Sequence, residues 1–448
     1  MMFERRGKTF LIIGILLVIS IGSAVVFFFL SALDLDKVRK DVQAKVAEVI
    51  PSEPIVSAQI MPDFSVYRDD LLKNSQDFLE INLQQKQVSF YQQGQVVKTA
   101  EILKLGDKVN WGGTPAGLYS VLSGGKEAYS AGAEAYMPYA LKFYGKYFLH
   151  GSPYYANGDV YASDFSGGCV QIADQDAKEF FDLTKINLPV LVIDQQNTEC
   201  PVAVLSDKPL PQIQAVNYLI ADLDCGEVLA QKNAQEKIAV GSLLDFLEAI
   251  VIAENIDLRD DLGVSAKAEQ MSCGASDVLQ AGGYYRAVDL FYPLLSENSA
   301  KANWVLAAFL GRQRMPQLMQ EKAKAMMMTT TTVSDIFSCD GEGNISTAQD
   351  LFYLARYLQN TRPPLLAISR KDKVRTFGAL PFDLASLSNQ NISADDETFV
   401  GGRVSVVNGS QYNGLFIFKN ISIILLKEDS LESLQKDALQ IKAWLGLP

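Results

Sequence analysis

The apolar and polar positions divide the chain into segments of different character, and the sharpest contrast lies near the N-terminus. Residues 10–31 are apolar or small, and no charged residue follows them before Asp34. A helix over this stretch is long enough to cross a bilayer at about 1.5 Å per residue. Basic residues in the short segment 1–9 predict that this end stays in the cytoplasm. We therefore expect a single transmembrane anchor, with the bulk of the chain outside the cytoplasm.

A cleaved signal peptide is the alternative interpretation of this segment. Ser31 and Ala32 are small residues near a suitable cleavage position. The apolar region of a signal peptide is normally shorter, about 7 to 15 residues, which favours the uncleaved anchor. Residues 32–77 then have a mixed-charge helical pattern that is interrupted by prolines, so we predict a stalk there.

From residue 78 the pattern changes to short alternating segments that are typical of β-structure. Residues 78–103 predict two strands around a Gln-Gly turn, and a Gly/Pro turn in 112–117 precedes another strand. One short helix is expected over 174–183, and a strand over 188–194 ends the unit. The sequence therefore predicts a mainly-β domain over 78–195.

A second domain is predicted over 215–448, after a proline-containing linker at 196–214. It begins with a hairpin over 217–233 and continues with a long helix around 241–255 and several further helices. Two closing strands, 402–409 and 413–426, precede a C-terminal helix. Strands at both ends with helices between them indicate an α+β domain whose ends meet in one sheet.

Composition narrows the functional classes. The 448 residues are 48% hydrophobic and 21% charged, which is typical of globular domains. A net charge of −12 excludes a nucleic-acid partner of the usual kind, because phosphate neutralisation requires a basic surface. The five cysteines are an odd number for an oxidising compartment, and none has the Cys-x-x-Cys spacing of a zinc site. They are Cys169, Cys200, Cys225, Cys273 and Cys339.

His150 is the only histidine, and Cys169 follows it by nineteen positions after two glycines. The two residues could be a nucleophile and its base, two metal ligands, or a coincidence. A cysteine attacks as its thiolate, and a neighbouring imidazole that takes the proton can act as the counter-ion. Gly167 and Gly168 allow backbone N–H groups to turn inward, as in an oxyanion hole. Cys169 is accordingly the best candidate for a free thiol.

Residues 78–194 resemble the L,D-transpeptidase catalytic domain, the YkuD-like family. The resemblance rests on His150-Gly151, on Ser166-Gly167-Gly168-Cys169-Val170, and on the turn at 112–117. It implies that Cys169 attacks the amide between an L-centre and a D-residue of a peptidoglycan stem. His150 would be the base and then the acid, the N–H groups of Gly168 and Cys169 would bind the oxyanion, and Ser166 would support the loop or the imidazole.

Two positions depart from the commonest form of that family. Gly167 stands where a histidine is frequent, and Gln171 stands where an arginine is frequent. Neither change removes the nucleophile or its base, but both put the substrate contacts in doubt. Gly151, Gly167 and Gln171 are the expected substrate contacts. Tyr154 and Tyr155 are either ordinary loop packing or a lid over the peptide stem.

Residues 215–448 resemble the serine-type D-alanyl-D-alanine carboxypeptidases of the penicillin-binding and β-lactamase fold. That family uses Ser-x-x-Lys, in which the lysine activates the serine. This chain has Ser242 but Asp245, it retains Ser-x-Asn as Ser296 and Asn298, and it has Arg403 where the Lys-Thr-Gly motif is expected. A carboxylate cannot replace the lysine, so we predict a catalytically inactive domain. It is either a retained scaffold or a module that docks peptide stems or a cell-wall protein.

Together these observations predict an outward-facing, single-pass bacterial membrane protein of peptidoglycan biosynthesis. It would form peptide cross-links through a cysteine thioester without a metal or diffusible cofactor. Two alternatives stay open. Water could resolve the same thioester, giving an L,D-carboxypeptidase or endopeptidase, or both domains could have decayed into a non-catalytic wall-binding scaffold.

Overall fold

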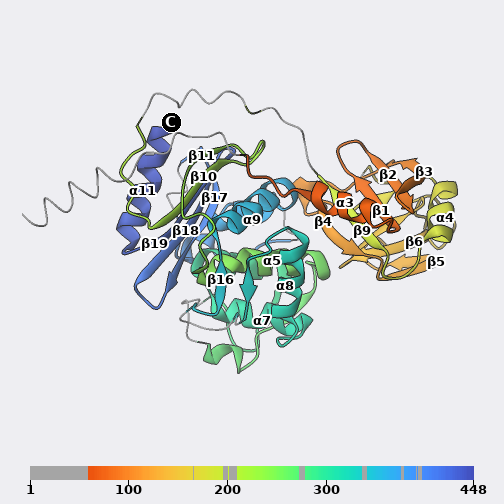
Figure 1. Cartoon of the computed structure of the whole chain (residues 1–448). Helices are drawn as coiled ribbons and strands as arrows, with labels where there is room; N and C mark the ends of the chain where they lie inside the picture. The colour runs from red at the N-terminus through yellow and green to blue at the C-terminus, as the bar shows by residue number, and fades with distance from the viewer. Residues whose placement is uncertain are drawn as a thin grey trace, which may run out of the picture. The chain divides into compact units, whose positions relative to one another are not determined.

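The computed structural model describes residues 59–164, 166–194, 200, 209–271, 278–334, 336, 341–374, 378–389, 391 and 396–447 (Figure 1). The predicted anchor at 10–31 and the first part of the predicted stalk lie outside these ranges. Within them, no helix combines the length and apolar character needed to cross a membrane.

The segment before the first strand belongs to the folded structure. Helix α3 (Phe64–Lys73) is capped by Asp63, whose side chain accepts a hydrogen bond from the Ser65 N–H. Arg68 in this helix donates to Glu80 at 2.6 Å and to the Tyr91 hydroxyl at 2.8 Å, and both partners belong to the first sheet. The predicted stalk therefore does not extend through α3.

The first domain, residues 78–194, consists of two sheets and one helix. One sheet has the strand order β3-β2-β1-β9-β4, and the other has the order β5-β6-β7-β8. The strands are β1 (Phe78–Asn82), β2 (Gln87–Gln92), β3 (Gln95–Glu101), β4 (Gly117–Ser120), β5 (Ser123–Ser130), β6 (Ala135–Tyr144), β7 (Tyr147–His150), β8 (Val170–Gln171) and β9 (Pro189–Ile193). The predicted helix is α4 (Asp174–Leu183).

The prediction of two strands over 78–103 was wrong, because this stretch forms three. Lys86 has a φ of 51° and ends a turn that separates β1 from β2. Buried side chains from both sheets and from α4 then form one core, which includes Ile81, Phe90, Leu149 and Phe180. This core fixes β7 and β8, the strands that carry the candidate site, against the rest of the domain.

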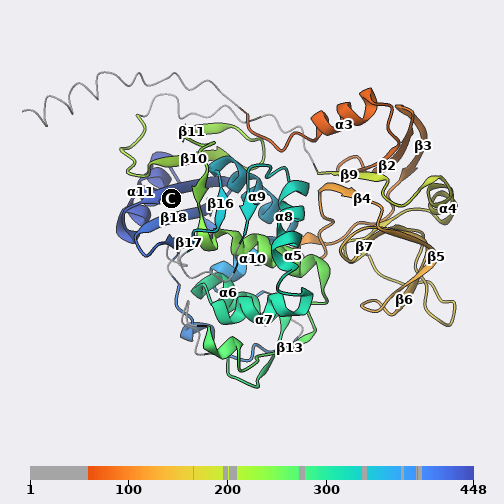
Figure 2. The same ribbon diagram turned by 60° about the horizontal axis from the view of Figure 1, so that its bottom comes forward.

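The second domain, residues 209–447, contains a sheet with the order β11-β10-β19-β18-β17 (Figure 2). Its strands are β10 (Asn217–Asp222), β11 (Val228–Lys232), β17 (Phe399–Val407), β18 (Gln411–Phe418) and β19 (Ile421–Glu428). Antiparallel pairing of β10 with β19 confirms that the two ends of the domain meet in one sheet. The closing segment 413–426, predicted as one strand, instead belongs to two strands that turn at Lys419, where φ is 52°.

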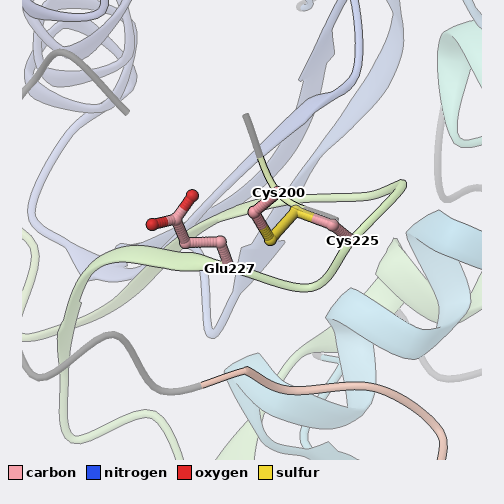
Figure 3. Close-up of side chains that lie close together, drawn as sticks. All are labelled: Cys200, Cys225 and Glu227. Carbon is pink, nitrogen blue, oxygen red and sulfur yellow. A yellow bond between two sulfur atoms is a disulfide. The ribbon is translucent and has the colours of Figure 1, made fainter. Parts of the chain in front are cut away.

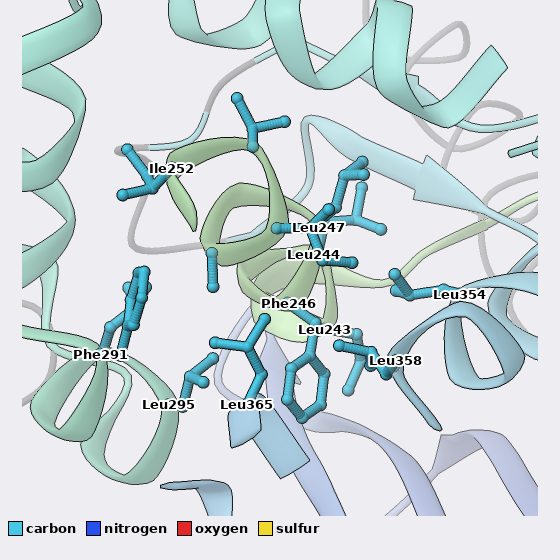
Figure 4. Packing of buried hydrophobic residues seen from close by; sticks show 14 of the residues in the cluster. Leu243, Leu244, Phe246, Leu247, Ile252, Phe291, Leu295, Leu354, Leu358 and Leu365 are labelled. Carbon is cyan, nitrogen blue, oxygen red and sulfur yellow. The ribbon is translucent and has the colours of Figure 1, made fainter. Parts of the chain in front are cut away.

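Helices cover both faces of this sheet. Along β19 the side chains alternate: Ile423 and Leu425 pack in one core with α11, whereas Ile424 and Leu426 face a core shared with α5 and α9. Figure 4 shows how buried residues of the core shared with α5 and α9 pack around α5. The helices are α5 (Asp245–Asn255), α6 (Ala287–Glu297), α7 (Ala300–Leu310), α8 (Met315–Ala325), α9 (Ala348–Thr361), α10 (Pro363–Ser369) and α11 (Leu431–Trp444). Short strands complete the domain: β12 (Ile238–Ala239), β13 (Asp261–Gly263), β14 (Tyr284–Arg286), β15 (Thr332–Val333) and β16 (Asn344–Ser346).

A disulfide joins Cys200 of the linker to Cys225 in the β10–β11 turn, and Glu227 lies beside it (Figure 3). Because both sulfur atoms are bonded to each other, this group does not offer thiolates to a metal. Cys169 is a free thiol, as expected. Cys273 and Cys339 lie outside the described residues.

Candidate active site

The pairing of β7 with β8 brings the candidate nucleophile and base together. These strands are parallel, with Leu149 opposite Val170 and His150 opposite Gln171. Cys169 directly precedes β8, so it and His150 lie on the same face of neighbouring strands, offset by two positions. A separation of nineteen residues in sequence thus becomes a diagonal contact position in the sheet.

Burial and one hydrogen bond define the state of the imidazole. His150 is 2% exposed, and its Nδ1 lies 2.6 Å from the carbonyl oxygen of Gly151. A carbonyl can only accept, so Nδ1 carries the proton and Nε2 is left with a lone pair. Burial lowers the pKa of His150 to about 4, so the ring is neutral near pH 7.

The thiol of Cys169 is also neutral. Its sulfur makes a long contact of 3.9 Å with the carbonyl oxygen of Lys146. Burial raises the pKa of Cys169 to about 11, against the opposing effects of the Phe148 backbone and of the Lys146 ammonium. The expected thiolate–imidazolium pair is therefore not the resting state. The reason is physical, because protein atoms replace water around the buried imidazole and around part of the half-buried thiol, so the charged forms lose solvation.

The loop before the nucleophile has the conformation that its glycines allow. Gly167 and Gly168 have φ values of 70° and 109°, in the left-handed region that side chains disfavour. The Ser166 hydroxyl donates to the carbonyl oxygen of Cys169 and closes the loop, which is the loop-supporting role expected for it. Among the described residues, the N–H group of Gly168 has no protein acceptor, and that of Cys169 lies at the end of the turn formed by Gly167 and Gly168. The Gly168 N–H group is thus free to donate to a developing oxyanion.

Gly151 and Gln171, two of the expected substrate contacts, have structural partners. A Cβ atom on Gly151 would lie 2.5 Å from a carboxylate oxygen of Asp174, which also accepts from the Ser152 N–H. Gln171 is buried, and its side-chain amide lies 3.5 Å from the Ser152 hydroxyl. Both residues therefore shape the loop that follows His150. Gly167, in contrast, would have open space around an added Cβ atom.

The two tyrosines pack on neighbouring aromatic rings. Tyr154 stacks on Tyr136 of β6 at 5.7 Å between ring centroids, and its hydroxyl bonds to Glu127 of β5. Tyr155 packs against Tyr161 at 5.4 Å. The structure thus supports ordinary loop packing for both, and the contacts found among the described residues connect neither ring to Cys169.

The second candidate site is occupied by an ion pair of its own. Arg403 on β17 binds Asp245 through Nη2, and its Nε donates to the Ser242 carbonyl oxygen at 2.5 Å. Its Nη1 donates to the carbonyl oxygen of Leu294 at 2.9 Å. Burial raises the pKa of Asp245 to about 6, while Arg403 opposes that shift. Asp245 and Arg403 therefore hold one another where the related enzymes need a free lysine beside the serine.

The remaining motif residues of this site have local partners as well. The Ser296 hydroxyl donates to the Tyr292 carbonyl oxygen in its own helix at 2.5 Å. Asn298 ends α6 with a left-handed φ of 57°, and its amide lies 3.5 Å from the Val404 carbonyl oxygen. The Ser405 hydroxyl, in turn, accepts from the Ser242 N–H at 2.9 Å. The motif positions lie around one site, but their polar groups are used by the protein itself.

Family comparisons agree with this division of the chain. Residues 76–192 match the L,D-transpeptidase catalytic domain, YkuD. Residues 203–402 match D-alanyl-D-alanine carboxypeptidase, Peptidase_S11. The chain carries an L,D-transpeptidase domain followed by a carboxypeptidase domain.

Curated relatives match the second part. The chain is 27% identical to D-alanyl-D-alanine carboxypeptidase DacC of Escherichia coli over 217 residues, covering 45% of this chain and 53% of that protein. It is 30% identical to DacB2 of Mycobacterium tuberculosis over 151 residues, covering 33% and 52%. The chain therefore spans about half the length of the curated relatives it matches.

Solved structures match the same part of the chain. A D-alanyl-D-alanine carboxypeptidase from Mycobacterium tuberculosis matches with 23% identity and a TM-score of 0.44, covering 53% of this chain and 92% of that one. Ampicillin-bound penicillin-binding protein D2 of Listeria monocytogenes matches with 21% identity and a TM-score of 0.46, covering 53% and 100%.

Three residues near Cys169 were not found from the sequence. Lys146 directly precedes β7 and Tyr147 begins it, and the Cys169 sulfur lies 3.9 Å from the Lys146 carbonyl oxygen. Arg362 of the carboxypeptidase domain donates to the Tyr147 hydroxyl. Strand alternation alone could have indicated that Tyr147 and Leu149 share a face, but no sequence signal connects either strand residue to Arg362.

Proposed function

We propose that this protein is an L,D-transpeptidase that uses Cys169 as its nucleophile and His150 as its acid–base group. The observation that supports it best is the geometry of the β7–β8 pair. It places a free cysteine, after two left-handed glycines, on the same face as a histidine whose tautomer is fixed with Nε2 unprotonated. The match of this domain to the transpeptidase family supplies the substrate class, peptidoglycan stem peptides.

The proposed reaction begins with attack of the Cys169 sulfur on the carbonyl carbon of the donor amide. The S–C bond forms as the thiol proton passes to Nε2 of His150, and the N–H groups of Gly168 and Cys169 bind the oxyanion. The C–N bond then breaks, and His150 returns the proton to the departing amine of the D-amino acid. In the second half, an acceptor amine attacks the thioester, its proton passes through His150, and the thiol is restored.

Neutral resting groups suit this sequence. A thiolate and an imidazolium would lack solvation here before substrate arrives, whereas a neutral pair moves its proton only as the new bond forms. Bound substrate also replaces water around the sulfur, so charge develops where the loop N–H groups can meet it.

The carboxypeptidase domain has no catalytic part in this proposal. Ser242 needs a neutral amine to take its proton, and Asp245 paired with Arg403 offers none. We also propose the outward-facing, membrane-anchored location that the apolar segment 10–31 favours.

The test is acylation of the full-length chain by the carbapenem meropenem, read by intact mass and peptide mapping. We expect one adduct on Cys169, absent in Cys169→Ala and slowed in His150→Ala. An adduct that depends on Ser242 instead would assign the chemistry to the second domain. No adduct at either residue would favour the wall-binding scaffold. Turnover of stem peptide with and without an acceptor amine then separates cross-linking from hydrolysis.

A further inference from the structure

The transpeptidase and carboxypeptidase domains share buried charges. Residues 57–448 pack as one compact unit. Within it, Glu254 of α5 pairs with Lys322 of α8 and with Arg362, each at 2.8 Å, and all three side chains are 0% exposed. Burial raises the pKa of Glu254, but Lys322 and Arg362 outweigh that effect and lower it, so the carboxylate stays charged.

Both cations donate hydrogen bonds to the transpeptidase domain. Lys322 donates to the Tyr119 hydroxyl at 2.8 Å. Arg362 donates through Nη1 to the Gly113 carbonyl oxygen at 2.7 Å and through Nη2 to the Tyr147 hydroxyl at 2.6 Å. The guanidinium serves these two acceptors and Glu254 at once through two separate nitrogens, whose N–H groups diverge in one fixed plane.

Both acceptors of Arg362 lead directly to the nucleophile loop. A Cβ atom on Gly168 would lie 2.4 Å from Cε1 of Tyr147 and 2.9 Å from the carbonyl oxygen of Gly112. The Tyr147 ring and the Gly112–Gly113 backbone therefore contact the residue before Cys169. Arg362 holds each of these supports by a hydrogen bond.

The same loop is anchored in the carboxypeptidase domain by an aromatic residue. Trp111 precedes Gly112 and is 8% exposed, and it belongs to the core formed by the second domain. Its ring stacks on Phe291 of α6 at 5.7 Å between centroids. The glycine loop thus reaches Gly168 from a fixed point on the other domain.

We propose that Arg362 of the carboxypeptidase domain is a positioning residue for the L,D-transpeptidase site, holding Tyr147 and Gly113 against Gly168 so that Cys169 and its oxyanion N–H groups keep their geometry. This inference rests on the proposed function for its chemistry but not for its geometry. The carboxypeptidase domain, on this account, was retained because it completes its neighbour's active site.

The test compares three variants of the full-length chain. Tyr147→Phe removes one hydroxyl and keeps the ring against Gly168. Arg362→Lys keeps the positive charge but loses the two separate nitrogens that bind Gly113 and Tyr147. Arg259→Lys is the control, because Arg259 also donates across the domains, to the Gly132 carbonyl oxygen at 3.3 Å, in the connection between β5 and β6. Hydrogen exchange of residues 166–171, alkylation of Cys169 by iodoacetamide, and meropenem acylation are measured for each.

We expect Tyr147→Phe and Arg362→Lys to speed exchange in 166–171 and to lower the maximal acylation rate on the order of 10- to 100-fold, with little change in the half-saturating concentration. Arg259→Lys should match the wild type in all three measurements. Wild-type exchange and acylation in both test variants, or equal damage in the control, would overturn the positioning role. If wild-type Cys169 takes no meropenem, the proposed function fails, while exchange and alkylation still decide the role of Arg362.

Discussion

The two nucleophile motifs of this chain differ in what surrounds them. The Cys169 sulfur contacts the Lys146 carbonyl oxygen and is influenced by the Phe148 backbone and the Lys146 ammonium. Around Ser242 the polar groups include a buried ion pair, with Arg403 bound to Asp245 and to the Ser242 carbonyl oxygen. Each motif contains its nucleophilic residue, so the presence of a nucleophile does not by itself tell an active site from an inactive one.

The two sites differ in whether hydrogen-bond donors remain available to a substrate. The N–H group of Gly168 has no protein acceptor among the described residues, whereas the Ser242 N–H donates to Ser405. A preorganised site must hold its donors unused until charge develops on the substrate. In the second site the polar groups are already bound to one another, which indicates a structural role.

The largest expected effect tests that structural role. Arg403→Met should destabilise the carboxypeptidase domain by about 3–5 kcal/mol, because it leaves the buried carboxylate of Asp245 without its cation. The double variant Arg403→Met/Asp245→Leu should recover much of this loss. Denaturant unfolding measures both, and equal destabilisation in the single and double variants would contradict the ion-pair account.

The neutral imidazole of the first site predicts a pH dependence of stability. The pKa of His150 is about 4 in the folded chain, below the ordinary value of 6.5, so the unfolded chain binds the proton first as pH falls. Its contribution is therefore complete above pH 6.5 and is lost between pH 6.5 and 4. The loss amounts to about 3 kcal/mol near pH 4, where the folded chain also begins to bind the proton.

Denaturant unfolding of the wild type and of His150→Gln across pH 4 to 7 measures this contribution. The difference between the two should shrink as the pH falls. A constant difference over that range would show that the imidazole is not buried in its neutral form.

Sequence patterns predicted those features that depend on neighbouring residues. Alternation indicated the β-rich first domain, and the helical pattern of 174–183 matches α4. The strand breaks at Lys86 and Lys419 were missed, because each depends on a non-glycine residue adopting a positive φ, which composition does not signal. The protonation states at His150 and Cys169 were missed because they follow from burial.

Contacts between residues far apart in the sequence were also not predicted. Asp245 and Arg403 are 158 positions apart, and Tyr147 and Arg362 are 215 apart. The loss of the lysine was visible in the sequence, but the partner of its replacement was set only by the packing of α5 against β17. The contact between the domains has no local pattern at all, because its charges sit at helix positions that sequence alone assigns equally well to solvent.

A smaller effect compares neighbouring glycines in the first site. Gly168→Ala should cost about 1–3 kcal/mol more than Gly167→Ala, because its Cβ atom would meet Tyr147 whereas that of Gly167 meets nothing within 4 Å. Backbone strain adds to the difference, because the φ of 109° at Gly168 lies farther from the left-handed region that alanine can adopt than the 70° at Gly167. Thermal unfolding and meropenem acylation should both single out Gly168→Ala, and equal behaviour of the two variants would show that the loop is not held by Tyr147.

The smallest expected effect concerns Ser242 itself. Ser242→Ala should change the unfolding free energy by no more than about 0.5 kcal/mol, because the contacts that hold this residue use its backbone N–H and carbonyl groups. Meropenem acylation of Cys169 should proceed at the wild-type rate in this variant. Loss of an adduct in Ser242→Ala, measured by intact mass beside Cys169→Ala, would show that the serine still reacts despite the Asp245–Arg403 pair, and that both sites are reactive.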